Sequence, residues 1–297
     1  MTSKDIATDE LTVDNSATDH CRSIGAILVE HGLLDLRKVE VVQKYAIERS
    51  IRFGDAAIQL NLITHDDVEF ALARQFKLPQ FQLGNNGVAQ EVVTAHGPQS
   101  EFVEPIRGLR TQLMVRWLPN AHRRILALTS PGRGEGRSWL AANLAVAFAQ
   151  VGMRTLLIDA DMRNPQQHRL FNLGNVPGLS ALLTGRGRAS MAHRIHPQLR
   201  LFVLPAGQVP PNPQELLAGS AFSVVLDRFA EQYDGGIVLI DTPAAAETSD
   251  AQLIVAKAGA AFVLGRRNYT RQGKLSSTMR DLKSTGANIV GCVLNNY

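Results

Sequence analysis

Short apolar runs alternate with helical patterns from residue 124 onward. Residues 125–128, 155–158 and 236–240 are runs of apolar side chains that favour β-structure. Such runs are typical of strands buried on both faces of a parallel sheet. An amphipathic helical pattern over residues 139–151 follows the first run. This alternation predicts an α/β domain over residues 101–297, with a mostly parallel sheet flanked by helices.

The beginning of the chain follows a different pattern. Residues 1–20 are polar and poor in large apolar side chains, which predicts a disordered arm. Residues 24–29 recur as residues 53–58, 29 positions later (53 − 24 = 29). This internal duplication predicts a small all-helical domain over residues 21–80. Residues 81–100 carry glycine, asparagine, glutamine and proline without periodicity, so we expect a linker there.

Each copy of the duplication has the pattern of a short helix, a turn and a longer helix. We place the two turns near Gly32 and Asn61. Thr64 is followed three residues later by Asp67, and this spacing predicts a helix N-cap. The duplicated unit is therefore expected to be a pair of helical hairpins.

The duplicated unit resembles the N-terminal domain of type II secretion and pilus assembly ATPases. Some members of that family bind cyclic di-GMP through tandem R-L-G-x-x-L repeats, each of which closes with a glutamine. In the first copy Ser23 and Ala46 replace the arginine and the glutamine of that motif. We therefore predict a domain that docks on a protein and does not bind cyclic di-GMP.

Composition and charge narrow the functional classes. The chain has 297 residues, enough for two domains, and its net charge of +4 is too small and scattered to indicate a nucleic-acid partner. Cys21 and Cys292 have no metal-binding or redox spacing. The N-terminus lacks the pattern of a signal peptide, and no apolar run is long enough to span a bilayer. We expect a cytoplasmic protein that reaches the membrane only through a partner.

A glycine-rich turn, residues 131–138 (Pro-Gly-Arg-Gly-Glu-Gly-Arg-Ser), joins the first strand to the helix after it. Strand, glycine-rich turn and helix form the layout of a phosphate-binding loop, in which backbone N–H groups and the helix N-terminus bind an anion. The common form is G-x-x-x-x-G-K-[ST]. Here Pro131 replaces the first glycine and Arg137 replaces the lysine. A plain glycine-rich turn between strand and helix is the alternative.

Acidic side chains end the next two predicted strands. Asp159 and Asp161 follow residues 155–158, and Asp241 follows residues 236–240. The carboxyl ends of parallel strands meet at the edge of the sheet where ligands bind. At a spacing of two, Asp159 and Asp161 are expected to face one site. A single aspartate at a strand end is more often a turn former, but the set suits Mg²⁺ bound between a hydroxyl, carboxylates and phosphates.

Three motifs together resemble those of bacterial tyrosine kinases, which control exopolysaccharide export and chain length. Residues 129–138 correspond to the first nucleotide motif of that family. Residues 156–165 (Leu-Leu-Ile-Asp-Ala-Asp-Met-Arg-Asn-Pro) correspond to the second, and the Asp-Thr-Pro triplet at 241–243 to the third. The resemblance covers residues 101–297. It implies a P-loop NTPase-like domain that uses ATP and Mg²⁺ to phosphorylate protein tyrosine.

The resemblance also implies a role for individual residues. It places the nucleotide contacts at Gly134, Glu135, Gly136, Arg137, Ser138 and Trp139. Ser138 and Asp241 would hold Mg²⁺. Asp159 and Asp161 would be the catalytic carboxylates, nearest to the transferred phosphate, where they orient the metal and the tyrosine hydroxyl.

The resemblance further implies assembly and a partner. Glu104, Arg107 and Arg110 match an E-x-x-R-x-x-R helix that the family uses to form rings. Charges at this spacing share one helix face, and a solvated surface is the alternative. The family also implies a membrane-embedded chain-length or export protein as the partner. The chain would then lie at the cytoplasmic side of the inner membrane.

Departures from the family pattern leave other interpretations open. Arg137 is longer than lysine and forked, and the Trp139 indole stands where a small hydroxyl side chain is usual, so we expect weakened ATP binding. The chain stops at Tyr297, which is either a residual phosphate acceptor or an end-of-domain residue. A catalytically degenerate scaffold of the export machinery is therefore an alternative. A cell-positioning ATPase of the deviant P-loop group is less favoured, because Gly132 stands where its extra lysine would be.

Overall fold

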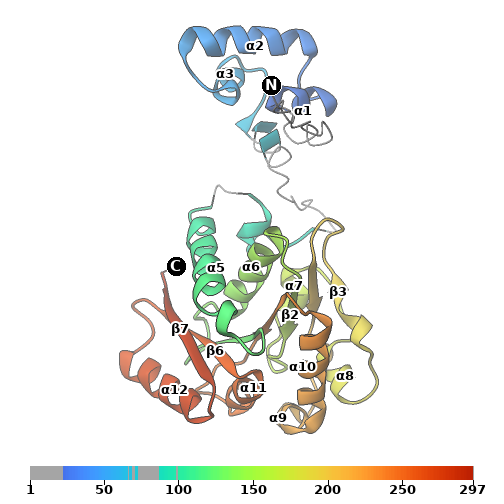
Figure 1. Ribbon diagram of the computed structural model, residues 1–297, viewed down its shortest axis with the longest axis vertical. Helices are drawn as coiled ribbons and strands as arrows, with labels where there is room; N and C mark the ends of the chain where they lie inside the picture. Colours follow the sequence, from blue (N-terminus) through green and yellow to red (C-terminus); the bar gives the residue numbers. More distant parts are fainter. Residues whose placement is uncertain (1–22, 66, 69–70, 73–86, 98–99, 297) are drawn as a thin grey trace, which may run out of the picture. The chain divides into compact units, whose positions relative to one another are not determined.

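The computed structural model describes residues 23–65, 67–68, 71–72, 87–97 and 100–296 (Figure 1). Contacts divide the chain into two compact units, Met1–Leu78 and Pro79–Tyr297. Each unit has an apolar core of its own. The expected disordered arm, residues 1–20, and Tyr297 lie outside the described residues.

The first unit contains three of the helices that the duplication predicts, and the last one, which follows Thr64, lies partly outside the described residues. The three are α1 (Ile24–Glu30), α2 (Leu36–Arg49) and α3 (Phe53–Gln59). Leu28, Val42 and Ala57 are completely buried between them. After α3, the Thr64 N–H donates to Asp67 Oδ2 at 2.8 Å, and the Asp67 N–H donates back to Thr64 Oγ1 at 3.2 Å. This reciprocal capping confirms the predicted N-cap.

The two copies are also equivalent in their packing. A Cβ placed on Gly25 would lie 3.3 Å from Val39, and one placed on Gly54 would lie 2.8 Å from Val68. Both pairs are separated by the repeat length (54 − 25 = 29; 68 − 39 = 29). In each copy, a valine at the same repeat position therefore packs closely against the glycine of the short helix. The turns are equivalent as well, because the residues predicted there are both left-handed, with φ of 69° at Gly32 and 53° at Asn61.

The expected linker is wrong for residues 87–97, which belong to the second unit. Val92 and Ala95 are buried in the main core of that unit, beside the turn η2 (Val93–Ala95). The Thr94 N–H donates to Asn143 Oδ1 at 3.0 Å. A single buried turn needs no helical periodicity, so the absence of a pattern did not indicate solvent exposure. Residues 81–86 and 98–99 of the expected linker lie outside the described residues.

The second unit is built on a seven-stranded sheet in the order β3-β4-β2-β5-β1-β6-β7. Its strands are β1 (Ile125–Thr129), β2 (Thr155–Asp159), β3 (His193–Arg194), β4 (Leu201–Leu204), β5 (Ile237–Asp241), β6 (Ala260–Arg266) and β7 (Asn288–Asn295). Only the β3–β4 pair is antiparallel within this sheet. All residues of β1, β2 and β5 are buried, as expected for strands covered on both faces.

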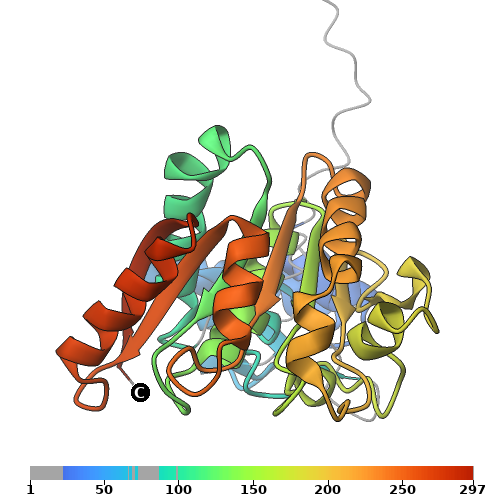
Figure 2. The ribbon, with the colours of Figure 1, turned by 90° about the horizontal axis from the view of Figure 1, so that it is seen from below.

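Helices cover both faces of the sheet (Figure 2). One face carries α5 (Val103–Arg116), α6 (Arg137–Gln150) and α7 (Gln167–Leu170), with η3 (Leu118–Asn120) beside them. The other carries α8 (Leu179–Leu183), α9 (Pro213–Ala218), α10 (Ser220–Gln232), α11 (Asp250–Ala258) and α12 (Gln272–Ser284), while η4 (Ala189–Met191) precedes β3. The predicted α/β fold with a mostly parallel sheet is confirmed.

Helix α6 differs from the prediction in how it is packed. It begins at Arg137 and is buried nearly all round, because the sheet lies on one side and α5 with η2 on the other. Its alanines, including Ala141 and Ala145, allow this close approach. The helix is therefore a central element rather than an amphipathic surface helix. The glycine loop before it is held from both sides.

Candidate nucleotide-binding site

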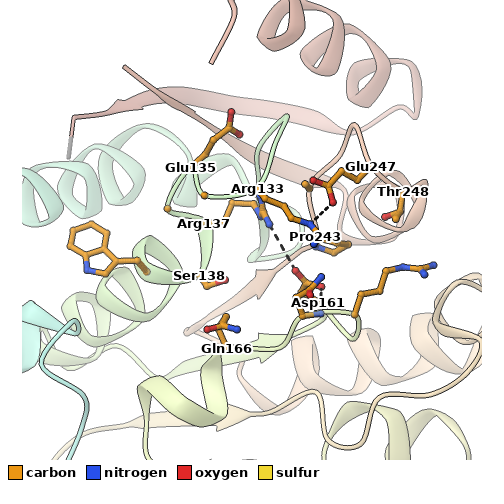
Figure 3. Close-up of a pocket in the computed structure, with 15 residues that line it drawn as sticks. Arg133, Glu135, Arg137, Ser138, Asp161, Gln166, Pro243, Glu247 and Thr248 are labelled. Atoms are coloured by element: carbon orange, nitrogen blue, oxygen red, sulfur yellow. Dashed lines mark hydrogen bonds and ion pairs between the residues drawn. The ribbon is translucent and has the colours of Figure 1, made fainter. Parts of the chain in front are cut away.

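The glycine loop connects the end of β1 to the start of α6. Gly134 and Gly136 have φ of 69° and 93°, in the left-handed region where a side chain would be strained. The loop and the first turn of α6 line a pocket together with Asp161 and the segment after β5 (Figure 3). A helix N-terminus behind a curled backbone is an anion-binding arrangement. The predicted phosphate loop therefore has the required shape.

The loop is fixed to the segment that follows β5. The Ala245 N–H donates to Ser130 O at 2.8 Å, and the Ala246 N–H donates to Pro131 O at 3.1 Å. The Thr242 hydroxyl donates to Leu128 O at 2.9 Å. These bonds hold one wall of the pocket against the beginning of the glycine loop.

Arg137 does not extend freely into the pocket. Its Nε donates to Thr242 O at 2.9 Å, and its Nη1 donates to Ser130 Oγ at 2.5 Å and to Gly132 O at 2.6 Å. Nη2 lies 3.9 Å from Asp161 Oδ2, and the residue is only 7 % exposed. The guanidinium therefore links the glycine loop to the end of β5. These contacts require a fork and would not be reproduced by a lysine.

Trp139 is among the residues that line the pocket, and its indole lies beside the N-cap residue of α5. It packs edge to face with Phe102, with the ring centroids 5.6 Å apart. Its backbone carbonyl accepts a hydrogen bond from the Asn143 amide at 2.9 Å. This packing favours an indole that leaves the phosphate loop unstrained, and the weakened ATP binding expected in part from Trp139 stays a prediction. The side chain leaves the helix on the side of α5, where an aromatic partner receives it.

Glu135 contributes a side chain as well as an amide. Its buried carboxylate accepts the Gly132 N–H at 2.7 Å and the Thr270 hydroxyl. The Asn295 side chain donates to Glu135 O at 3.2 Å. Thr270 follows β6 and Asn295 ends β7, so both strands brace the loop. Sequence reasoning missed Thr270 and Asn295, because no motif connects positions so far apart in the chain.

The two carboxylates at the end of β2 do not face one site equally. Asp161 lines the pocket and accepts the Asn164 N–H at 2.9 Å. Asp159 is completely buried and accepts the N–H groups of Gln166 at 3.0 Å and Gln167 at 2.9 Å. The expectation of a matched pair is wrong because the chain turns directly after β2. The spacing of two then no longer puts both side chains on one side.

Asp241 lies beside Asp159 on the neighbouring strand, in register with it. Its carboxylate accepts hydrogen bonds from the Ser138 hydroxyl and from Gln167 Nε2, the latter at 2.8 Å. Burial, with a smaller contribution from Asp161, raises the pKa of Asp241 to about 6. Burial and the neighbouring Asp241 raise the pKa of Asp159 as well. Gln167 was not predicted, although it connects the ends of β2 and β5 with α6.

The Ser138–Asp241 pair fits a divalent cation. Asp241 Oδ1 is buried and has no hydrogen-bond partner in the part of the chain that the structure describes. A buried carboxylate oxygen without a partner is costly, and a hard cation such as Mg²⁺ would satisfy it. Among the described residues no group of three or more His, Cys, Asp or Glu could hold a metal alone. The pair therefore suits Mg²⁺ that also takes oxygen ligands from phosphates and water.

The charged helix motif is divided between two environments. Arg107 Nη1 lies 2.5 Å from Glu104 Oε1 on α5. Arg110 turns toward α6 instead, where its Nη1 donates to Ala147 O at 3.3 Å. Glu104 and Arg107 therefore pair with each other, while Arg110 contacts the neighbouring helix. Assembly through this helix stays a prediction.

Fold and site together define a P-loop nucleotide-binding domain. No protein-family model matches the chain. It is 36 % identical over 200 residues to CapB of Staphylococcus aureus, which is named as a tyrosine-protein kinase, covering 67 % of this chain and 86 % of that protein. It is also similar to the crystal structure of the chimerical protein CapA2B2, with a TM-score of 0.64, 34 % identity, and coverage of 77 % of this chain and 98 % of that one. The chain belongs to the family of bacterial tyrosine-protein kinases.

Other relatives set limits to this comparison. The chain spans only 28 % to 32 % of the length of several longer tyrosine-protein kinases that it matches. A likeness to the septum site-determining protein MinD of Pyrococcus horikoshii has a TM-score of 0.51 at 23 % identity, covering 59 % of this chain and 70 % of that one. It is a likeness of fold alone. Among the described residues, no helix has the length and apolar character needed to cross a bilayer.

Proposed function

We propose that the second unit binds ATP with Mg²⁺ and phosphorylates protein tyrosine, in the control of exopolysaccharide synthesis and export. The observation that carries the proposal is the unpartnered Asp241 Oδ1 beside the Ser138 hydroxyl, at the helix that begins where the glycine loop ends. Membership of the bacterial tyrosine-protein kinase family supports it. When bound, Mg²⁺-ATP supplies the phosphoryl group, and the chain contributes positioning and charge stabilisation.

The residues divide these tasks. The amides of Gly134, Glu135 and Gly136 face the phosphates from the loop. Ser138 and Asp241 would hold the metal. Asp161 lines the pocket, 3.9 Å from Arg137, and would orient the incoming tyrosine hydroxyl. Asp159 acts as a positioning residue, because it holds the backbone of Gln166 and Gln167 and thereby the Gln167 amide on Asp241.

Titration calorimetry of the full chain with ATP, with and without Mg²⁺, tests the binding step. We expect Mg²⁺-dependent affinity that is lost in Asp241→Asn and strongly reduced in Ser138→Ala, while Ser276→Ala on the exposed side of α12 binds like the wild type. Mass spectrometry for phosphotyrosine after incubation with Mg²⁺-ATP tests the transfer step. A wild type that binds no ATP contradicts the proposal.

A scaffold without kinase activity is the second candidate. It is favoured by Arg137, whose guanidinium is already engaged by Thr242 O, Ser130 Oγ and Gly132 O. ATP binding without any phosphotyrosine, on the chain itself or on a tyrosine peptide, would decide for the scaffold. A cell-positioning ATPase is the weakest candidate, because the likeness to MinD is one of fold and Gly132 replaces the extra lysine of that group.

We further propose a membrane-embedded polysaccharide chain-length or export protein as partner, with this chain on the cytoplasmic side of the inner membrane. Membership of the bacterial tyrosine-protein kinase family supports this proposal. The first unit is proposed to dock on a protein and not to bind cyclic di-GMP, because Ser23 caps α1 through its hydroxyl instead of providing an arginine. Calorimetry of the full chain with cyclic di-GMP checks this, and micromolar binding would contradict it.

A further inference from the structure

Three arginines line the nucleotide pocket, and they differ in their partners and in their exposure to solvent. Arg137 is buried and donates to loop and strand-end acceptors. Arg163 holds Asp250 through Nε at 2.7 Å and Nη2 at 3.4 Å, and the Asp250 side chain is only 1 % exposed. Arg133 pairs with Glu247 at 2.5 Å, and their side chains are 63 % and 36 % exposed. Arg133 is therefore the most solvated of the three.

Because their present partners and exposure differ, the three arginines also differ in the free-energy cost of moving onto a bound phosphate. Freeing Arg137 would leave Thr242 O, Ser130 Oγ and Gly132 O without this donor in a buried place. Freeing Arg163 would leave a buried carboxylate uncompensated, which is strongly unfavourable. An exposed ion pair such as Arg133–Glu247 contributes little to stability. Arg133 is thus the arginine that can leave its present partner for a phosphate at the lowest cost in free energy.

The backbone of Glu247 is held in place, and the loop that carries Arg133 is braced as well, through Gly132 O and Gly134 O. Glu247 directly follows Ala245 and Ala246, whose N–H groups bind the carbonyls of Ser130 and Pro131. Arg133 lies in the loop between Gly132 and the left-handed Gly134, with φ of 69° at the latter. Figure 3 shows its side chain extending from the loop toward Glu247. The solvated Arg133 side chain is therefore the part of this pair that can rotate away from Glu247.

We propose that Arg133 is the phosphate-binding cation of this loop and that Glu247 holds it until nucleotide is bound. Arg137, at the position of the usual lysine, then braces the loop instead of binding phosphate directly. The planar fork of Arg133 suits two oxygens of one phosphate, and the released Glu247 carboxylate remains solvated. This inference rests on the proposed function, because it requires a nucleotide phosphate in the pocket.

The affinity of the full chain for Mg²⁺-ATP tests the proposal. Losing a hydrogen bond to a charged group corresponds to about a tenfold to hundredfold change in affinity. We therefore expect Arg133→Ala to weaken binding by that factor, and Arg133→Lys to weaken it less. Glu247→Gln should tighten binding, because the competing carboxylate is gone. In the double variant Glu247→Gln should have no further effect, since Arg133 is absent.

The Arg169–Glu91 pair provides a matched control. Its atoms lie 2.6 Å apart, its side chains are similarly exposed, and neither residue lines the pocket. Arg169→Ala and Glu91→Gln should leave the affinity unchanged. Thermal unfolding checks that Arg133→Ala is folded like the wild type. Wild-type affinity in Arg133→Ala, with no gain in Glu247→Gln, would overturn this inference alone, whereas a wild type that binds no Mg²⁺-ATP overturns the proposed function with it.

Discussion

Replacing Arg137 by lysine restores the residue that the common phosphate loop carries, but it removes a buried cross-link. The guanidinium serves Thr242 O, Ser130 Oγ and Gly132 O, and a single ammonium on a different stem cannot satisfy all of these acceptors. Each hydrogen bond lost contributes about 0.5–1.5 kcal/mol, and a buried acceptor left unpaired costs about 1–3 kcal/mol. We expect Arg137→Lys to lower the free energy of unfolding of the second unit by about 1–3 kcal/mol.

Tryptophan fluorescence in urea measures this change for the second unit specifically. The chain has two tryptophans, Trp117 and Trp139, and both lie in that unit. Arg169→Lys, in an exposed pair, is the control and should stay within about 0.5 kcal/mol of the wild type. Equal unfolding midpoints for wild type and Arg137→Lys would refute the view that Arg137 braces the loop.

Bound nucleotide should raise the free energy of unfolding of Arg137→Lys. A lysine that is no longer tied to the loop carbonyls can reach a phosphate, so Arg137→Lys is expected to bind Mg²⁺-ATP at least as tightly as the wild type. Saturation at 100 times the dissociation constant adds about 2.7 kcal/mol of stability, enough to offset the loss. The effect of Arg133→Ala should also be smaller in the Arg137→Lys background. A variant that is less stable and also binds less tightly would show that Arg137 itself contacts the phosphates.

Three further predictions concern other parts of the second unit. Trp139→Thr should cost about 1–3 kcal/mol of stability through the lost Phe102 contact. It should change the Mg²⁺-ATP affinity by less than about threefold, and tenfold tighter binding would indicate that the indole strains the loop. Gly178→Ala should lower the free energy of unfolding by about 3–5 kcal/mol, because a Cβ would lie 1.9 Å from Pro205 O. Gly273→Ala in α12 is the control and should not destabilise the protein, since a Cβ there would have nothing within 4 Å. In sedimentation, the double variant Arg107→Ala with Arg110→Ala should self-associate more weakly than the wild type, and the control Arg116→Ala should not. If the wild type and both variants are all monomers, the prediction of ring assembly is contradicted.

The fold could be predicted because its signals are local. Runs such as residues 125–128 and 155–158 lie within one residue of the strand ends, since an uninterrupted apolar run has few alternatives to a buried parallel strand. The duplication was equally clear, because a repeat of 29 residues fixes both helices and turns. Residues 87–97 were assigned wrongly, since a short buried turn leaves no periodic signal. Packing against α6, and not sequence pattern, holds that segment in place.

The site could be predicted in position but not in its connections. The strand-end rule placed Asp161 at the pocket and Asp241 beside Asp159 below it, because parallel strands bring their carboxyl ends together. The rule cannot say which carboxylate turns inward, and Asp159 turned out to hold the backbone after β2. Thr270 and Asn295 were missed because they meet the loop across β6 and β7.

The same limit applies to the arginines of the loop. A motif compares positions, so it assigns the role of the missing lysine to the residue that replaces it, Arg137. Burial and hydrogen bonding determine how much free energy the release of each arginine costs, and this cost is lowest for Arg133. The common loop motif allows any residue at the position of Arg133. A substitution at a motif position can therefore leave phosphate binding intact when a neighbouring side chain of like charge is free to move. If Arg133 binds the phosphate as proposed, the engagement of Arg137 by the loop no longer argues for a scaffold.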